Sequence, residues 1–196
     1  MEEKKGVSRR AFLGASVASG AAVTAAGALG AAVPARAAGT DRIAFVTANL
    51  VAQVTDWRFE LAQWGEQHKK TVAATDEAAW RAVCAKIASH GFKAVEVWEA
   101  HAAPEVMDKK RCAAWKAALD DNGLQAIGYG GMFSRKTVDI CLALGIPQIN
   151  GWIGDQTPDQ AAALCKETGV RFNLENHPQK TARELLDIIG GGNEWL

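Results

Sequence analysis

The feature that most limits the fold is an alternation of short β-like runs with helical runs, which begins near Asp41. From the third run onward the runs start at Leu124, Ile146 and Val170, so they are spaced 22 and 24 residues apart. Short apolar runs separated by single amphipathic helices are typical of parallel strands joined by crossover helices. The five predicted strands cover residues 42–50, 93–98, 124–129, 146–150 and 170–175.

Helix signals lie between and after these runs. Capping residues followed by acidic residues or Gln predict helices that begin at Thr75, Thr157 and Thr181, the last two with a capping box. Glycine predicts helix ends near Gly91 and Gly145. The apolar stripes expected to face the sheet are Trp80/Val83/Cys84/Ile87, Cys112/Trp115/Leu119 and Val138/Cys141/Leu142.

Repeated βα units of this kind build either a (β/α)₈ barrel or an open, doubly wound sheet. No Gly-rich phosphate loop follows the first predicted strand, so the nucleotide-binding form of the open sheet lacks its main signature. We expect an α/β fold, a partial (β/α)₈ TIM barrel of about five βα units. An open parallel α/β sheet is the alternative.

The first 37 residues differ from the rest of the chain. Ser8-Arg9-Arg10-Ala11-Phe12-Leu13 resembles the start of a twin-arginine export signal, and residues 11–33 carry no charge. Ala35 and Ala37 are the small residues that a signal peptidase reads. We expect residues 1–37 to be a removable signal peptide, residues 38–196 to be the mature domain, and the protein to be exported to the periplasm or beyond. A permanent anchor is the alternative, although Ala and Gly provide little transfer energy.

The charges divide at the same boundary. The chain has 22 Lys and Arg against 22 Asp and Glu, but residues 1–37 carry +3 and residues 38–196 carry −3. A mildly acidic domain lacks the basic excess of nucleic-acid-binding proteins, so we expect no nucleic acid partner. The four cysteines have no short metal-binding spacing and fall on predicted apolar stripes, which indicates small core residues.

Candidate chemistry lies at the ends of the predicted strands. In the last strand Asn173 and Glu175 share a face, and His177 follows if the extended run continues. A carboxylate and an imidazole at this spacing suit one divalent metal ion, or acid–base work beside it. The alternative is an exposed Glu and a loop His that caps the next helix.

A second group follows the second strand. Glu99 and His101 are predicted to share a face there, and Trp98 can form a stacking wall for a sugar ring. Trp152, after the fourth strand, has the same reading. The alternative places Trp98 in the core and Glu99 in solvent.

Two segments, Gly91–His101 and Phe172–Pro178, together with Thr181–Gly190, resemble the xylose isomerase-like TIM barrels, and most closely the sugar phosphate isomerase/epimerase family. The resemblance implies a divalent ion (Mn²⁺, Mg²⁺, Co²⁺ or Zn²⁺) and proton transfer next to the carbonyl of a small sugar. It assigns Glu175 as metal ligand and proton-transferring carboxylate, and His101 and His177 as substrate contacts. Trp98, Trp152 and Glu99 complete the predicted sugar-binding set.

The chain departs from that family in length and in ligands. A full barrel takes ~250 residues, and of the family's late-strand metal ligands the sequence has the position of Glu175 alone. We therefore expect a C-terminally truncated barrel that can lack the metal. Its open sheet edges favour a homo-oligomer or a complementing chain. The alternative function is a non-catalytic carbohydrate-binding or partner-dependent exported protein.

Overall fold

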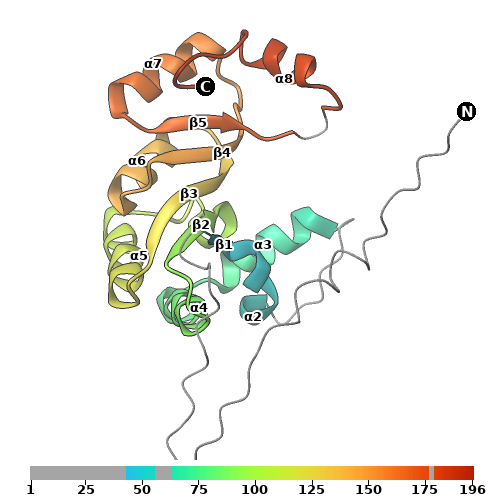
Figure 1. Ribbon diagram of the computed structural model, residues 1–196. Helices are drawn as coiled ribbons and strands as arrows, with labels where there is room; N and C mark the ends of the chain where they lie inside the picture. The colour runs from blue at the N-terminus through green and yellow to red at the C-terminus, as the bar shows by residue number, and fades with distance from the viewer. Residues whose placement is uncertain (1–42, 56–62, 177–178) are drawn as a thin grey trace, which may run out of the picture. The chain divides into compact units, whose positions relative to one another are not determined.

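The computed structural model describes residues 43–55, 63–176 and 179–196, and the predicted signal peptide lies outside them. The described residues contain five parallel strands in one sheet, as predicted (Figure 1). The strands follow one another across the sheet in chain order. They are β1 (Ala44–Val46), β2 (Ala94–Trp98), β3 (Gln125–Met132), β4 (Gln148–Trp152) and β5 (Arg171–Leu174).

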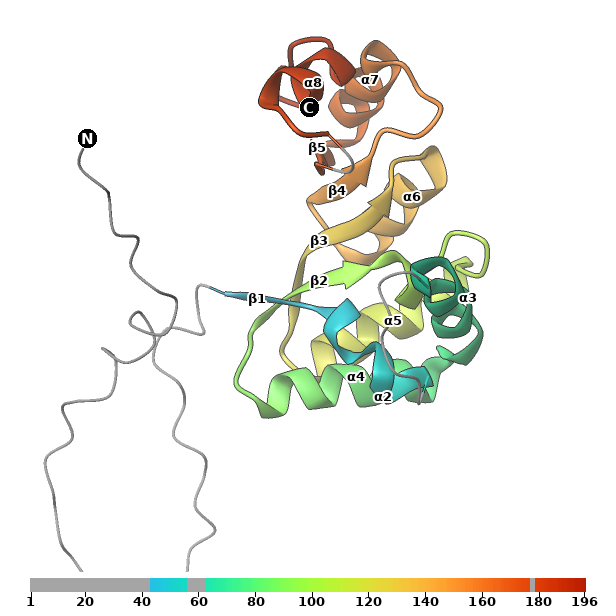
Figure 2. The same ribbon diagram turned by 90° about the vertical axis from the view of Figure 1, so that its right-hand side faces the viewer.

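Four helices form one layer against this sheet (Figures 1 and 2). In chain order they are α4 (Glu77–Ser89), α5 (Lys109–Asp121), α6 (Arg135–Leu144) and α7 (Pro158–Thr168), and each packs against the next. Five further elements complete the description: the 3₁₀ helices η2 (Thr47–Leu50) and η4 (Glu99–His101), and the helices α2 (Val51–Thr55), α3 (Trp64–Ala74) and α8 (Ala182–Ile188).

The strand order explains why α4 to α7 lie together. Right-handed crossovers that always step to the next strand place every connecting helix on the same face. A doubly wound sheet reverses its order at a switch point and has helices on both faces. The described arrangement is thus that of a partial barrel, or of an open parallel sheet whose strands keep chain order.

The main core lies between the sheet and the helix layer. Alternate strand residues point into it, and the fully buried ones are Val95, Val97, Tyr129, Ile149 and Phe172. Each of the helices α4 to α7 adds one buried cysteine, all four with free thiols, as predicted for core residues: Cys84, Cys112, Cys141 and Cys165.

The pairing of β2 with β3 contains an irregularity. Val95 pairs with Ala126, but the next residue, Glu96, pairs with Gly128. Ile127 is therefore an extra residue in β3, as in a β-bulge. Beyond it Trp98 pairs with Gly130, so both glycines lie opposite side chains that point away from the helix layer.

Several predicted boundaries were wrong, among them the end of the third strand, which continues to Met132 rather than ending at residue 129, and two others have a clear structural cause. The first strand ends at Val46 rather than at residue 50, because the Thr47 hydroxyl is buried and accepts a hydrogen bond from Trp98 N at 2.9 Å, which turns the chain into η2. Helix α4 begins after Asp76, whose side chain accepts from Ala79 N at 2.8 Å. Thr75, the predicted cap, instead donates back to Thr71 O at the end of α3.

Later helix signals held with small differences. The capping box of α7 is present as predicted, with Thr157 and Gln160 bonded reciprocally. At α8, Thr181 caps Glu184 N, but the Glu184 carboxylate accepts from Lys180 N, one residue before the expected donor. Leu142 was expected on the buried stripe and is 50% exposed, because Leu144 takes the buried position.

Candidate functional site

A hydrogen-bonded row of three polar side chains lies on the sheet face opposite α4 to α7, and we call it the polar row: Glu96, Asn150 and Asn173. Asn173 Nδ2 donates to Asn150 Oδ1 at 2.8 Å, and Asn150 Nδ2 donates to Glu96 Oε2. Glu96 and Asn150 are half-buried, whereas Asn173 is exposed. The row joins β2, β4 and β5 and passes over β3 without a side chain from that strand.

Glycines in β3 make this crossing sterically feasible. A Cβ at Gly128 would lie 2.9 Å from Asn150 Nδ2 and 3.0 Å from Glu96 Oε2, and one at Gly130 would lie 3.2 Å from Glu96 Oε1. The Glu96 carboxylate therefore rests on the β3 backbone at both glycines. A larger residue at Gly128 would push the carboxylate and the amide apart.

The direction of the hydrogen bonds follows from the chemistry of the row. An ionised carboxylate only accepts, so Asn150 must turn its Nδ2 towards Glu96 and its Oδ1 towards Asn173. Each amide then retains one N–H, and Glu96 Oε1 and Asn173 Oδ1 retain acceptor capacity. A surface with both donors and acceptors suits hydroxyl groups, since a hydroxyl both donates and accepts.

Predicted site residues lie at the carboxyl ends of these strands. Glu175 N donates to Gly151 O at 2.9 Å, which holds the exposed Glu175 beside the end of β4. Trp152 is 44% exposed there and pairs in register with Met132. Glu99 Oε2 accepts from Met132 N at 2.8 Å, so its carboxylate holds η4 to the end of β3. Glu99, Trp152 and Glu175 thus lie along one edge of the sheet.

The predicted common face of Glu99 and His101 was wrong. These residues form a 3₁₀ turn, in which residues two apart point in different directions. His101 is 1% exposed, and its Nδ1 lies 3.1 Å from Thr47 Oγ1. Burial lowers the pKa of His101 to about 4. The imidazole is therefore an interior group, and its predicted contact with substrate would need it to leave the core.

Trp98 is also covered. The residue is 8% exposed, and its ring packs against Trp64 and His68 of α3, with ring centroids 4.9 and 5.7 Å away. This matches the core alternative for Trp98 and leaves Trp152 as the more exposed of the two predicted stacking residues. His177 lies outside the described residues.

A divalent metal does not fit the donors that the structure describes. Within residues 43–55, 63–176 and 179–196 no three His, Cys, Asp or Glu side chains are grouped as metal ligands. Glu175 is the ligand that the family resemblance implies, and a single carboxylate is a poor site for a divalent ion.

Glu96 and Asn150 were not singled out as candidates from the sequence, and Asn173 was noted only because it shares a strand face with Glu175. The available signal was that Glu96, a charged residue, is flanked by Val95 and Val97 in a mostly apolar strand. Its partner Asn150 is 54 residues away in the chain, so spacing along the sequence did not connect them.

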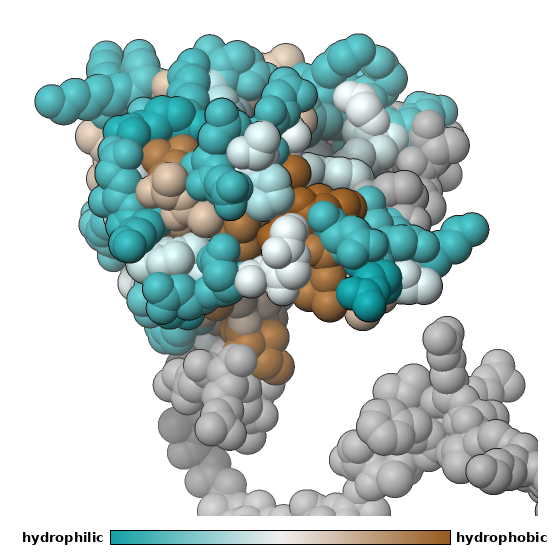
Figure 3. All heavy atoms as spheres, turned by 90° about the horizontal axis from the view of Figure 1, so that it is seen from above, coloured by the Kyte–Doolittle hydropathy of each residue, from teal (hydrophilic) through white to brown (hydrophobic). Residues whose placement is uncertain are grey.

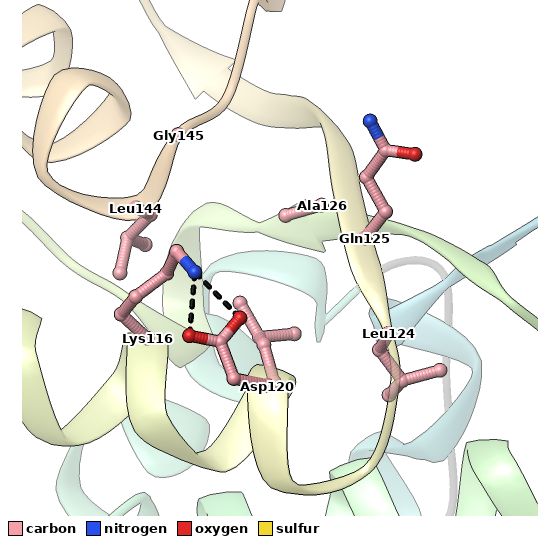
Figure 4. A pocket seen from close by; sticks show the side chains of 8 residues that line it. Lys116, Asp120, Leu124, Gln125, Ala126, Leu144 and Gly145 are labelled. Atoms are coloured by element: carbon pink, nitrogen blue, oxygen red, sulfur yellow. Dashed lines mark hydrogen bonds and ion pairs between the residues drawn. The ribbon is translucent and has the colours of Figure 1, made fainter.

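A pocket of about 210 Å³ lies at the opposite end of the strands (Figure 4). It is lined where α5 and α6 end and β3 begins, and the Lys116 ammonium contacts both Asp120 carboxylate oxygens there, at 2.5 and 2.6 Å. The amino ends of barrel strands usually serve stability rather than chemistry. Because Lys116 and Asp120 already neutralise each other, the polar row is the stronger candidate site.

Figure 3 views the molecule from the side of α7, β5 and α8. This surface is mostly hydrophilic and surrounds an exposed hydrophobic area. Helix α8 has no buried residue, and its Leu186 is 41% exposed. Among the helices that the structure describes, none is long and apolar enough to cross a membrane.

Comparisons with known proteins bear on the fold. No family model matches the chain, and no curated protein matches it either. Among solved structures, the chain is similar to a crystal structure of an uncharacterized protein from Parabacteroides distasonis, with 13% identity and a TM-score of 0.50. The match covers 80% of this chain and 61% of that protein, so the chain spans less than two thirds of its length. At this identity the likeness extends to the α/β fold and no further.

Proposed function

We propose that the polar row and the neighbouring strand ends bind a small sugar or similar polyol, in a protein of the sugar isomerase/epimerase kind. The observation that carries this proposal is the hydrogen-bonded row of Glu96, Asn150 and Asn173 across a glycine floor. Its remaining donors and acceptors match vicinal hydroxyl groups. Trp152, at the same edge, offers an aromatic face to the C–H side of a ring.

Isomerisation requires a base beside the bound sugar. In the proposed reaction the Glu175 carboxylate removes the proton on the carbon next to the carbonyl, and the C–H electron pair forms an ene-diol(ate). Return of a proton to either carbon, or to the other face of the same carbon, gives the isomer or the epimer. Hydrogen bonds from the asparagine amides would stabilise the developing oxyanion.

The alternative is a non-catalytic sugar-binding protein. It is favoured by the engagement of two carboxylates: Glu96 accepts from Asn150 Nδ2, and Glu99 accepts from Met132 N. Groups held in this way serve as fixed acceptors more readily than as bases. On this reading sugar binds but no proton moves.

Calorimetric titration of the full chain with neutral ketoses tests the binding. Asn173→Ala removes an exposed end of the row and should weaken binding by roughly tenfold, the size of one hydrogen bond. Gln125→Ala, at the far end of β3, is the matched control and should leave affinity unchanged. Absence of binding at millimolar sugar, or equal loss in both variants, would refute the proposal.

Deuterium exchange then separates the two functions. Incubation with a ketose in D₂O should place deuterium on the carbon next to the carbonyl if Glu175 acts as a base. Glu175→Gln should abolish that exchange and retain binding. Binding without exchange in the unmodified protein supports the non-catalytic alternative.

A further inference from the structure

A second group of polar side chains, from α3, η2 and η4, is buried. Thr47, Gln67 and Thr71 are fully buried, and His101 is 1% exposed. Helix α3 packs directly against η4, the turn that contains His101. This group lies apart from the polar row and does not depend on the proposed function.

The contacts of Thr47 bear on which nitrogen of the His101 ring carries the hydrogen. Thr47 Oγ1 accepts from Trp98 N at 2.9 Å, and its own hydrogen can go to His101 Nδ1 at 3.1 Å. Burial lowers the pKa of His101 to about 4, so the ring is neutral at pH 7 and carries one N–H. With Nδ1 accepting from Thr47, that hydrogen is on Nε2.

Three buried polar atoms of this group then lack a hydrogen-bond partner among the described residues: His101 Nε2 and both amide atoms of Gln67. Two of them are donors and one is an acceptor. Buried amide and imidazole groups are rarely left unpaired, because desolvation without a hydrogen bond is costly. Where protein atoms do not satisfy such groups, buried water does.

We infer that Gln67 and His101 bind internal water at the contact between α3 and η4. The water accepts from His101 Nε2–H and donates to Gln67 Oε1. It thereby ties helix α3 to η4, the same short turn from which Glu99 reaches the end of β3. A water bound at this site would therefore help to fix the position of η4 and, through Glu99, of the carboxyl end of β3.

Nuclear magnetic resonance on the ¹⁵N-histidine-labelled full chain tests this directly. The expected result at pH 7 is the Nε2–H tautomer of His101, with a slowly exchanging Hε2 that shows a cross-peak to long-lived water. His90, which is exposed, serves as the control and should show no such proton. An Nδ1–H tautomer, or an Hε2 without a water cross-peak, would overturn the inference.

A stability measurement gives an independent readout. Gln67→Met keeps the length of the side chain and removes its polar atoms. If Gln67 holds water that also serves His101, the variant should lower Tm, whereas the exposed Gln53→Met in α2 should not change it. An unchanged or raised Tm in Gln67→Met would mean that the Gln67 amide has no bound partner, and would overturn the inference.

Discussion

The buried imidazole of His101 should make the fold sensitive to acid. Its pKa in the folded protein is about 4, against an ordinary value of 6.5, because burial disfavours the charged ring. The unfolded chain therefore binds the proton more readily than the folded chain does. The contribution of His101 to the free energy of unfolding is full above pH 6.5, falls as the pH drops from 6.5 to 4, and changes no further below 4.

The size of this effect follows from the pKa difference. One pKa unit corresponds to 1.36 kcal/mol, so the shift from 6.5 to about 4 removes about 3 kcal/mol of stability across that pH range. Since domains of this size are commonly stable by about 5–15 kcal/mol, such a loss would be readily measured.

Urea unfolding of the full chain at several pH values between 7 and 4 measures it. His101→Asn retains an acceptor for Thr47 and removes the titrating group. Between pH 7 and pH 4 its free energy of unfolding should therefore decrease by about 3 kcal/mol less than that of the unmodified protein. The carboxylates are the same in both proteins, so their contribution to the pH dependence of the free energy of unfolding cancels in the comparison. His90→Asn, at an exposed position, is the control and should follow the unmodified protein. Parallel pH profiles for the unmodified protein and His101→Asn would refute the burial argument.

Four further results are expected. Gly128→Ala should lower Tm and weaken sugar binding, because its Cβ would lie 2.9 Å from Asn150 Nδ2. Gly65→Ala in α3, with no atom within 4 Å, should stabilise the helix by about 0.5–1 kcal/mol in the same thermal melts. The four core cysteines should not react with Ellman's reagent in the native protein and should all react in urea, because their thiols are buried and burial raises their pKa values. Reaction of any one of them without unfolding would contradict the described packing. Thr157→Ala should cost about 1 kcal/mol in urea unfolding through loss of the α7 capping box, and an unchanged midpoint would show that the cap is dispensable.

Local sequence signals predicted most of the fold. Apolar runs and caps placed the strands and the helices α4 to α7, because both depend on residues close together in the chain. Local signals failed where a residue distant in the chain determines the end of an element. Strand β1 ends at Thr47, whose hydroxyl accepts a hydrogen bond from Trp98 N, 51 residues away. Helix α3, which has a polar sequence, was not predicted at all.

The candidate site was predicted less well than the fold. Glu175 and Trp152 do lie at the carboxyl edge of the sheet, since strand ends can be read from periodicity. His101 was misplaced because the extended run was continued through residues that form a 3₁₀ turn. Glu96 was not identified because its role depends on the glycines of the neighbouring strand β3, which leave room above that strand, and on the Asn150 amide two strands away in β4.

The extra residue in β3 has a consequence for how such a surface can change. If Ile127 were paired with Glu96 instead of forming a bulge, the pairing that starts at Val95 and Ala126 would place Gly128 opposite Val97 and Tyr129 opposite Trp98. The phenol ring would then occupy the surface over which Glu96 now reaches Asn150, and the core would lose its largest β3 side chain. The bulge at Ile127 thus keeps the surface open, because it places Gly128 rather than a larger side chain opposite Glu96. Removal of Ile127 would leave Glu96 opposite Gly128 and Val97 opposite Tyr129, so the open surface depends on this pairing rather than on the length of β3.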